Sequence, residues 1–203
     1  KPFDRRVLIW EAADVAEAAV LEGVAAVSPE DFDKQAYRES LEARLGMSYS
    51  VMRGVFNQVK GRRKRIVFPE GDHEKVIRAA AQCIEQQICE PILLGNVDNI
   101  KQKMADLNIE FDCEITNPRY DSRRIGNYDL ELLENRSRKG MTIIDAQRLL
   151  KSRPYFAAQM VELGDADGFL GGISRNYADV LRPCLEIIGS NEDSHCAIGC
   201  YMM

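Results

Sequence analysis

Short apolar runs alternate with amphipathic segments through the middle of the chain. Residues 66–68 and 91–94 are apolar runs of strand length, and each is followed by a glycine-containing turn and by apolar positions three and four residues apart. Residues 113–115 form a weaker run of the same kind. Repeated strand, turn and helix units are typical of a parallel sheet with helices on both faces. The pattern therefore predicts an α/β fold, with Asp72 capping the helix after the first strand.

The beginning of the chain has a helical pattern with no strand signal. Within residues 1–27, one stripe is expected to contain Val7, Trp10, Val15, Ala18 and Ala19. Gly23 is placed to end this helix, and a second helix is expected over residues 32–45, with Ser28 or Asp31 as its cap. We expect a domain boundary near Gly46, which divides the chain into residues 1–45 and 46–203.

Three further helices are expected in the second half of the chain. The first begins at Tyr128 and stops at Gly140, because glycine commonly follows the last helical residue. Thr142 and Asp145 have the spacing of a capping box, with Asp in place of Glu, and they start the second helix. The third helix is expected over residues 156–163.

The last apolar segments predict more sheet. Residues 185–188 are expected to form a strand, and residues 196–203 read as the beginning of another. We therefore expect an α/β fold that is truncated at the C-terminus of this chain.

Residues 164–183 carry the strongest local signal for a ligand site. A short apolar run there ends in Gly171 and Gly172, which predicts a tight loop between a strand and a helix. Ligands of open α/β sheets settle at such strand ends, where backbone N–H groups can approach them. Asn176, Asp179 and Arg182 follow at intervals of three, close to one helical face. Arg182 can hold a phosphate or a carboxylate, or it can pair with Asp179 in a purely structural turn.

Composition narrows the partners that need to be considered. The chain has 203 residues and a net charge of -5, which argues against nucleic acid or an anionic membrane as the main partner. No apolar run reaches the length of a membrane span, and no signal peptide opens the chain, so a cytoplasmic location is expected.

The cysteines are expected to be reduced residues of the core, with no role in a metal site. They fall mostly inside apolar patterns, with no CxxC pair, at Cys83, Cys89, Cys113, Cys184, Cys196 and Cys200. Only two histidines, His73 and His195, could complete a zinc site. We therefore expect no metal to be bound.

The motifs taken together resemble those of phosphate acetyltransferases, which move an acetyl group between coenzyme A and phosphate. The resemblance rests on RIVFPEGDHEKVIRAA, PILLG, KGMT at Lys139–Thr142, GDADG at Gly164–Gly168 and LRPCLEIIG at Leu181–Gly189. It implies a two-lobed fold similar to that of isocitrate and isopropylmalate dehydrogenases, with coenzyme A in the cleft between the lobes. Arg136 and Arg182 match the cleft arginines of the family. The catalytic serine, arginine and aspartate of the family lie beyond Met203, so no catalytic residue is assigned here.

Residues 1–45 resemble the end of a malic enzyme domain and its linker. The likeness rests on PFDRRVL and AAVLEGVA. In hybrid malic enzymes an NADP-dependent, decarboxylating domain with a divalent metal precedes a transferase-like domain that binds acetyl-CoA and reports it to the malic site. Arg175, Asn176 and Tyr177 stand where transferases have a histidine and small hydroxyl residues, and this bulkier version resembles the fused branch. Asn176, Tyr177, Gly171 and Gly172 are therefore expected to line the acetyl-CoA site with the two arginines.

Three functions stay open at this point. The resemblance favours an acetyl-CoA-binding regulatory domain that controls the conversion of malate to pyruvate and CO2. The alternatives are a working phosphate acetyltransferase and a module that serves assembly alone. In each case we expect a homo-oligomer, because the leading helix and the last apolar segment would leave apolar surface exposed on a single chain.

Overall fold

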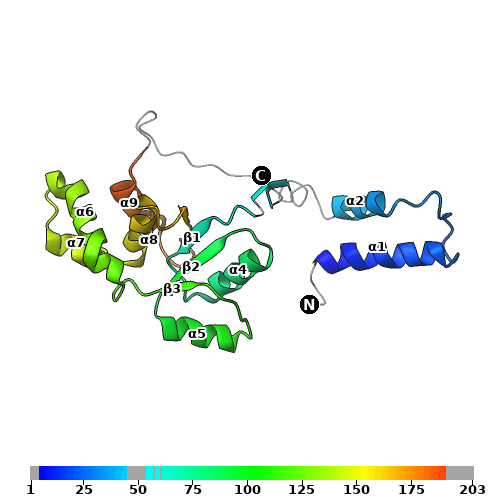
Figure 1. Ribbon diagram of the computed structural model, residues 1–203, viewed down its shortest axis with the longest axis horizontal. Coiled ribbons are helices and arrows are strands. Elements are labelled where there is room, and N and C mark those ends of the chain that lie inside the picture. The colour runs from blue at the N-terminus through cyan, green and yellow to red at the C-terminus, as the bar shows by residue number, and fades with distance from the viewer. Residues whose placement is uncertain (1–4, 45–53, 57, 60, 191–203) are drawn as a thin grey trace. The chain divides into compact units, whose positions relative to one another are not determined.

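The computed structural model describes residues 5–44, 54–56, 58–59 and 61–190 (Figure 1). The chain divides after Gln58 into two compact units. The boundary expected near Gly46 and the strand expected over 196–203 lie outside the described residues, so both stay predictions. None of the described helices is long and apolar enough to cross a membrane.

The first unit contains helices α1 (Arg5–Leu21) and α2 (Lys34–Arg44). Gly23 has φ of +74° and follows α1, as predicted. The stripe predicted for α1 is wrong in its largest members, because Trp10 is 62% exposed and Val15 is 67% exposed. The buried residues of α1 are Ile9, Ala13 and Val20, whose spacings of four and seven place them on one face.

The cap of α2 also differs from the prediction. Asp33 Oδ1 accepts hydrogen bonds from the backbone N–H groups of Gln35 and Ala36, at 2.8 and 3.1 Å. Ser28 instead donates its hydroxyl to the Asp31 carboxylate. The capping residue is therefore the one directly before the helix, which is the position from which a short carboxylate reaches the first free N–H groups.

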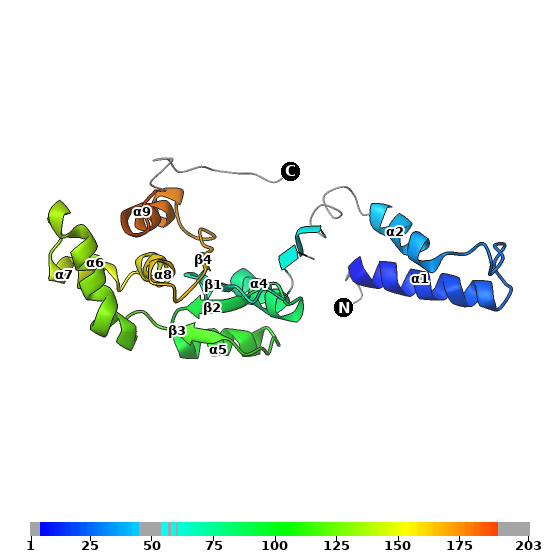
Figure 2. The same ribbon diagram turned by 45° about the horizontal axis from the view of Figure 1, so that its top comes forward.

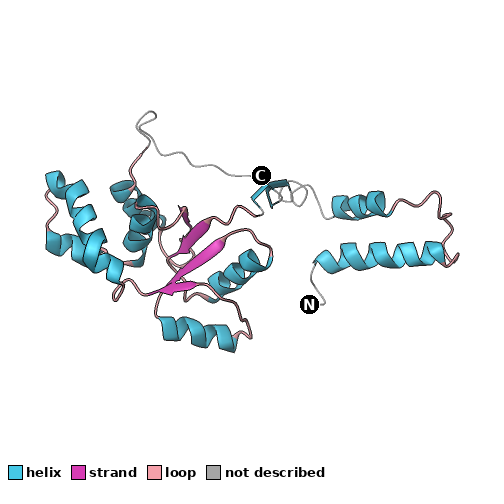
Figure 3. Cartoon of the chain, viewed as in Figure 1, coloured by secondary structure: helices cyan, strands magenta, loops and turns pink. Residues whose placement is uncertain are grey.

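The second unit is built on a parallel sheet of four strands. They are β1 (Arg65–Phe68), β2 (Glu90–Leu94), β3 (Glu114–Thr116) and β4 (Gly168–Phe169), and Figure 3 draws strands in magenta. Their order across the sheet is β3-β2-β1-β4. All three pairings are parallel. The prediction of an α/β fold with a parallel sheet is confirmed.

Alternation along the strands sends side chains into two separate cores. Helices lie over both faces of the sheet (Figure 2). Phe68 and Leu93 pack with α4 (Glu74–Glu85) and α5 (Val97–Asp106). Val67, Ile92 and Leu94 belong to the other core, which includes residues of α6 (Asp129–Arg136), α7 (Ile143–Leu149), α8 (Arg153–Glu162) and α9 (Tyr177–Ile187). The sheet is thus covered by helices on both faces.

Two local predictions about helix starts are resolved by hydrogen bonds. Thr142 and Asp145 form the predicted capping box at the start of α7. The cap of α4 is His73, whose Nδ1 accepts the N–H of Lys75 at 3.2 Å, and not Asp72. Asp72 is drawn away because its carboxylate pairs with Arg153 of α8.

The strand predicted over residues 185–188 is wrong, because α9 continues through Pro183 to Ile187. Pro183 and Ile187 are both buried, one helical turn apart, while Leu185 is 44% exposed. The buried residues therefore follow a helical spacing, and packing holds the helix together despite its internal proline.

Candidate functional site

Strand order changes direction next to β1, and this position defines a crevice at the carboxyl edge of the sheet. From β1 the chain proceeds outward to β2 and β3, whereas β4 is added on the opposite side of β1. The loop after β1 (residues 69–73) and the loop after β4 (residues 170–176) both leave this edge. Ligands of open α/β sheets bind at such a switch point.

Glu70 fastens these two loops together. Its Oε2 accepts hydrogen bonds from the N–H groups of Gly172 and Ile173, at 2.7 and 3.0 Å. Its Oε1 accepts from the N–H and the hydroxyl of Ser174, at 2.8 and 2.7 Å. The Glu70 residue is only 4% exposed. The backbone N–H groups that were expected to face a ligand at this loop are therefore bound to a carboxylate of the chain itself.

The pKa of Glu70 is shifted below its ordinary value. Burial acts to raise this pKa, but hydrogen bonds from the Ser174 hydroxyl and from the three backbone N–H groups stabilise the carboxylate and outweigh the burial. Glu70 is thus ionised at neutral pH and supplies the negative charge that the N–H groups require.

Two glycines lie where this edge of the sheet leaves no room for a side chain. A Cβ on Gly71 would lie 2.8 Å from the Leu93 Cβ and 2.9 Å from the Leu94 backbone nitrogen. A Cβ on Gly171 would lie 2.9 Å from a ring carbon of Phe169. The glycines therefore serve close backbone packing at this edge.

A second connection at the same edge joins Asp72 to Arg153. The guanidinium donates in parallel to both carboxylate oxygens, at 2.7 and 3.0 Å, and Lys103 donates to the Asp72 carbonyl at 2.7 Å. The pKa of Asp72 is lowered mainly by its hydrogen bonds from Arg153, against an opposing effect of burial.

This pair lines a polar hollow of about 670 Å³ at the strand ends. The lining consists of Asp72, Asn96, Asn117, Pro118, Arg119, Tyr120, Lys151, Ser152, Arg153, Ser174 and Arg175. Four of these side chains are cationic and one is anionic. The hollow is therefore suited chemically to an anion, such as a phosphate group.

Of the two predicted arginines, Arg182 belongs to α9, and Arg136 at the end of α6 contacts the same helix one turn further along. Arg136 Nη1 donates to the carbonyl of Glu186 at 3.1 Å, and the Tyr155 hydroxyl donates to the Glu186 carboxylate at 2.8 Å. The pKa of Tyr155 is raised to about 12 by burial and by Glu186, while the charges of Arg182 and Arg136 act in the opposite direction. Both guanidinium groups thus act electrostatically on the same hydroxyl.

Arg182 is exposed and its side chain is available to a ligand. Among the described residues, no ion pair joins Arg182 to Asp179, so the structural pairing considered from sequence is not formed. Arg182 and Tyr177 line a hollow of about 400 Å³ along α9.

A second hollow along α9, of about 360 Å³, brings other predicted residues together. Its lining includes Gly171, Gly172, Arg175 and Tyr177. Asn176 precedes the first residue of α9, and its side chain makes no capping hydrogen bond. Arg175 lines both this hollow and the polar hollow at the strand ends, so it links the two.

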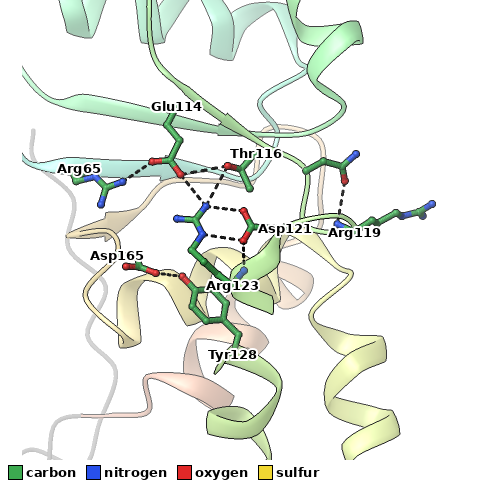
Figure 4. A network of polar contacts seen from close by, with 9 residues as sticks. Arg65, Glu114, Thr116, Arg119, Asp121, Arg123, Tyr128 and Asp165 are labelled. Atoms are coloured by element: carbon green, nitrogen blue, oxygen red, sulfur yellow. Dashed lines mark hydrogen bonds and ion pairs between the residues drawn. The ribbon is translucent and has the colours of Figure 1, made fainter. Parts of the chain in front are cut away.

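A network of ion pairs around Arg123 holds the edge strand β3 to the helical layer (Figure 4). Arg123 Nη2 donates to Glu114 and to Asp121, each at 2.9 Å, and its Nε donates to Asp121 at 3.0 Å. Arg65 of β1 donates to the other oxygen of Glu114 at 2.6 Å. Nearby, the Tyr128 hydroxyl donates to Asp165, and burial followed by this contact raises the Tyr128 pKa. These side chains satisfy one another, which is typical of a structural network.

Sequence reasoning missed Glu70, Arg153 and the Arg123 network. Glu70 lies in the turn expected after the first strand, and an acidic residue between Pro69 and Gly71 directly after a buried strand is a usable signal. Its partners lie 102 to 104 residues away, and no local pattern identifies them. Within the described residues no group of three or more His, Cys, Asp or Glu side chains could hold a metal ion.

The known proteins similar to this chain include malic enzymes and phosphate acetyltransferases. The model of the family phosphate acetyl/butaryl transferase matches residues 50–203. The NADP-dependent malic enzyme of Rhizobium meliloti (strain 1021) is 36% identical over 192 residues, covering 91% of this chain and 25% of that protein. The phosphate acetyltransferase of Thermoanaerobacterium thermosaccharolyticum is 33% identical over 139 residues, covering 68% of this chain and 42% of that protein.

Solved structures of phosphotransacetylases are also similar to this chain. A phosphotransacetylase from Streptococcus pyogenes superposes with a TM-score of 0.65 at 33% identity, covering 68% of this chain and 42% of that one. This chain spans about a quarter of the length of the malic enzymes that it matches.

Proposed function

Because the chain belongs to the phosphate acetyl/butaryl transferase family, we propose that residues 46–203 act as an acetyl-CoA-binding regulatory domain of an NADP-dependent malic enzyme. In this proposal the domain senses acetyl-CoA and controls the conversion of malate to pyruvate and CO2 elsewhere in the same polypeptide. NADP and the divalent metal are assigned to the malic enzyme domain. The proposal includes a cytoplasmic homo-oligomer.

One observation carries the choice of a fused protein over a free transferase. The similarity to malic enzymes extends over 91% and 97% of this chain, whereas the similarity to two phosphate acetyltransferases extends over 68% and 73%. The malic enzymes therefore match a larger part of the chain, which supports the reading of residues 1–45 as the end of a malic enzyme domain and its linker.

The charges along α9 support acetyl-CoA as the ligand. Coenzyme A carries several phosphate charges, and an acidic protein needs localised donors to hold them. Arg182 is exposed, Arg136 lies near it, and Arg175 connects the α9 surface with the polar hollow. In this proposal the surface between these cations is lined by Gly171, Gly172, Asn176 and Tyr177. We assign recognition to guanidinium groups, because Glu70 already occupies the N–H groups of the loop.

Arg182→Ala is expected to weaken acetyl-CoA binding about tenfold to a hundredfold, because a charged hydrogen bond contributes roughly 1.5 to 3 kcal/mol. Arg182→Lys should recover only part of the loss, since lysine keeps the charge but not the planar fork. Isothermal titration calorimetry of each variant with acetyl-CoA measures the effect. Arg138→Ala is the control, because Arg138 is an exposed basic residue of the nearby 3-10 turn Ser137–Lys139. An unchanged dissociation constant for Arg182→Ala, with unchanged circular dichroism, would refute the site.

The alternative function is phosphate acetyltransferase activity, which the 33% identity to a phosphate acetyltransferase and the basic hollow favour. Acetyl phosphate formation from acetyl-CoA and phosphate, assayed on the full-length protein, separates the two. Robust turnover would establish the alternative. If the domain is regulatory, no acetyl phosphate should form. Arg182→Ala should then weaken the inhibition of malate decarboxylation by acetyl-CoA and leave the uninhibited rate unchanged.

A further inference from the structure

The end of α4 brings two cysteines into contact. The N–H of Ile88 donates to the carbonyl of Cys83 at 2.9 Å, and the N–H of Gln87 donates to the carbonyl of Ile84 at 3.0 Å. These two hydrogen bonds define a Schellman motif, in which the chain reverses directly after the helix. Gln87 adopts the left-handed conformation that the motif requires, with φ of +56°. Cys89 is the next residue after the motif, and the reversal returns it to the last turn of α4.

The two thiols influence each other across this reversal. Each shifts the pKa of the other, and both residues are half-buried. Because Cys89 directly follows a reversal that is hydrogen-bonded to the Cys83 carbonyl, a disulfide between the two would close a short loop. The reversal also has a fixed place in the fold, because Gly61 N–H donates to the Gln87 carbonyl and Cys89 immediately precedes β2.

The pair lies at the opposite edge of the sheet from the candidate acetyl-CoA site. Cys89 lines a hollow of about 750 Å³ at the amino ends of the strands, together with Arg63, Arg65 and Cys113. Cys83 does not line this hollow, but it is half-buried and lies across the reversal from Cys89, which borders the opening. The hollow has no part in the function proposed above.

The surroundings distinguish Cys83 from the other described cysteines. The hydrogen bond from Cys89 lowers the pKa of Cys83, and the same contact raises the pKa of Cys89. Burial, assisted by Asp112 and Glu114, raises the pKa of Cys113 to about 11. Burial also raises the pKa of Cys184. Since the thiolate is the reactive form, the Cys83–Cys89 pair should react before Cys113 and Cys184.

We propose that Cys83 and Cys89 form a peroxide-sensitive dithiol that closes to an intramolecular disulfide. The Cys83 thiolate attacks one oxygen of a hydroperoxide, the O–O bond breaks, and Cys83 becomes a sulfenic acid while hydroxide leaves and is protonated to water. The Cys89 sulfur then attacks the Cys83 sulfur, the S–O bond breaks, and a second water leaves. Two thiols and one hydrogen peroxide thus give one disulfide and two waters.

Peptide mapping after exposure to hydrogen peroxide tests this directly. Trypsin cleaves after Arg78 and Lys101, so both cysteines fall in one peptide, residues 79–101. In the protein treated with a slight excess of hydrogen peroxide and then with iodoacetamide, this peptide should lose two hydrogens and carry no alkyl group. Cleavage after Glu85 should leave its halves linked until a reductant is added.

Cysteine variants assign the roles. Cys89→Ser should stop at the Cys83 sulfenic acid, which dimedone traps, and Cys83→Ser should leave Cys89 free for alkylation. Cys113→Ser is the matched control, since Cys113 borders the same hollow and has no thiol partner within the described part of the chain, and it should leave the disulfide unchanged. In the untreated protein, iodoacetamide should alkylate Cys83 at least about tenfold faster than Cys113.

Three results would each overturn the proposal. In the first, Cys83 and Cys89 of the wild-type protein both remain open to alkylation after peroxide treatment. In the second, Cys83 is oxidised to a sulfinic acid without a disulfide. In the third, Cys113 is oxidised as fast as Cys83. The wild-type measurement needs no substitution, so a variant that fails to fold does not prevent the test.

Discussion

Glu70→Gln is expected to lower the free energy of unfolding by about 2 to 4 kcal/mol at neutral pH, because it leaves buried N–H groups without an acceptor. The carboxylate accepts from three backbone N–H groups and one hydroxyl, using both of its oxygens. Glutamine keeps one acceptor oxygen and turns an NH2 group toward the remaining donors. Urea denaturation followed by circular dichroism measures the loss.

The same substitution should change how stability depends on pH. The pKa of Glu70 in the folded protein lies below its ordinary value, which is about 4.3 in an unfolded chain. A carboxyl group with a lowered pKa contributes stability above its unfolded pKa, and that contribution disappears as the pH falls through the folded pKa. The stability difference between wild type and Glu70→Gln should therefore be full at pH 7 and shrink progressively below pH of about 4.

An exposed glutamate gives the control for this experiment. Glu162 is exposed at the end of α8, and Glu162→Gln should leave both the stability at pH 7 and its acid dependence nearly unchanged. A difference between wild type and Glu70→Gln that stays constant from pH 7 to acid would contradict the assignment of this pH dependence to Glu70.

Arg123→Met should destabilise the protein by about 2 to 3 kcal/mol, since removing one member of a partly buried ion-pair network leaves its partners poorly compensated. The guanidinium serves Glu114 of β3 and Asp121 together, and the Asp121 side chain is only 11% exposed. Methionine keeps much of the apolar stem, so the loss reports the charged contacts more than packing.

Arg148→Met is the matched control for the Arg123 experiment. Arg148 also pairs with an aspartate, at 3.3 Å, but its side chain is 76% exposed. Solvent screens such a pair, and no measurable change in stability is expected. A double-mutant cycle with Arg123→Met and Asp121→Asn then isolates the pair. A coupling energy near zero would show that the destabilisation of Arg123→Met comes from another contact.

Local patterns predicted most of the sheet and its covering helices. The runs at residues 66–68 and 91–94 became β1 and β2, because a strand buried on both faces must be apolar at every position. The strand expected over 185–188 failed for the opposite reason. A short segment with three apolar residues after a proline is compatible with either structure, and only the packing of Pro183 and Ile187 in the core selects the helix.

The candidate site depended on contacts that no local pattern contains. Gly171 and Gly172 predict a loop whose backbone N–H groups bind a ligand. The N–H groups of this loop do converge on one acceptor, but that acceptor is the carboxylate of Glu70. Arg136 and Arg182 came from the family resemblance, and the structure places both near Tyr155. The likeness to isocitrate and isopropylmalate dehydrogenases stays a prediction, as does the binding of acetyl-CoA.

The position of β4 beside β1 has a consequence for the order in which the chain folds. β1, β2 and β3 can pair as soon as residue 116 has left the ribosome, since their connections are short. The remaining edge of β1 must wait for β4, whose contact with β1 spans 102 residues of sequence. During that interval β1 is an open, apolar edge, which is a surface that can pair with another nascent chain. Glu70 and its N–H partners also meet only when β4 arrives, so the crevice should form after β1, β2 and β3 have paired.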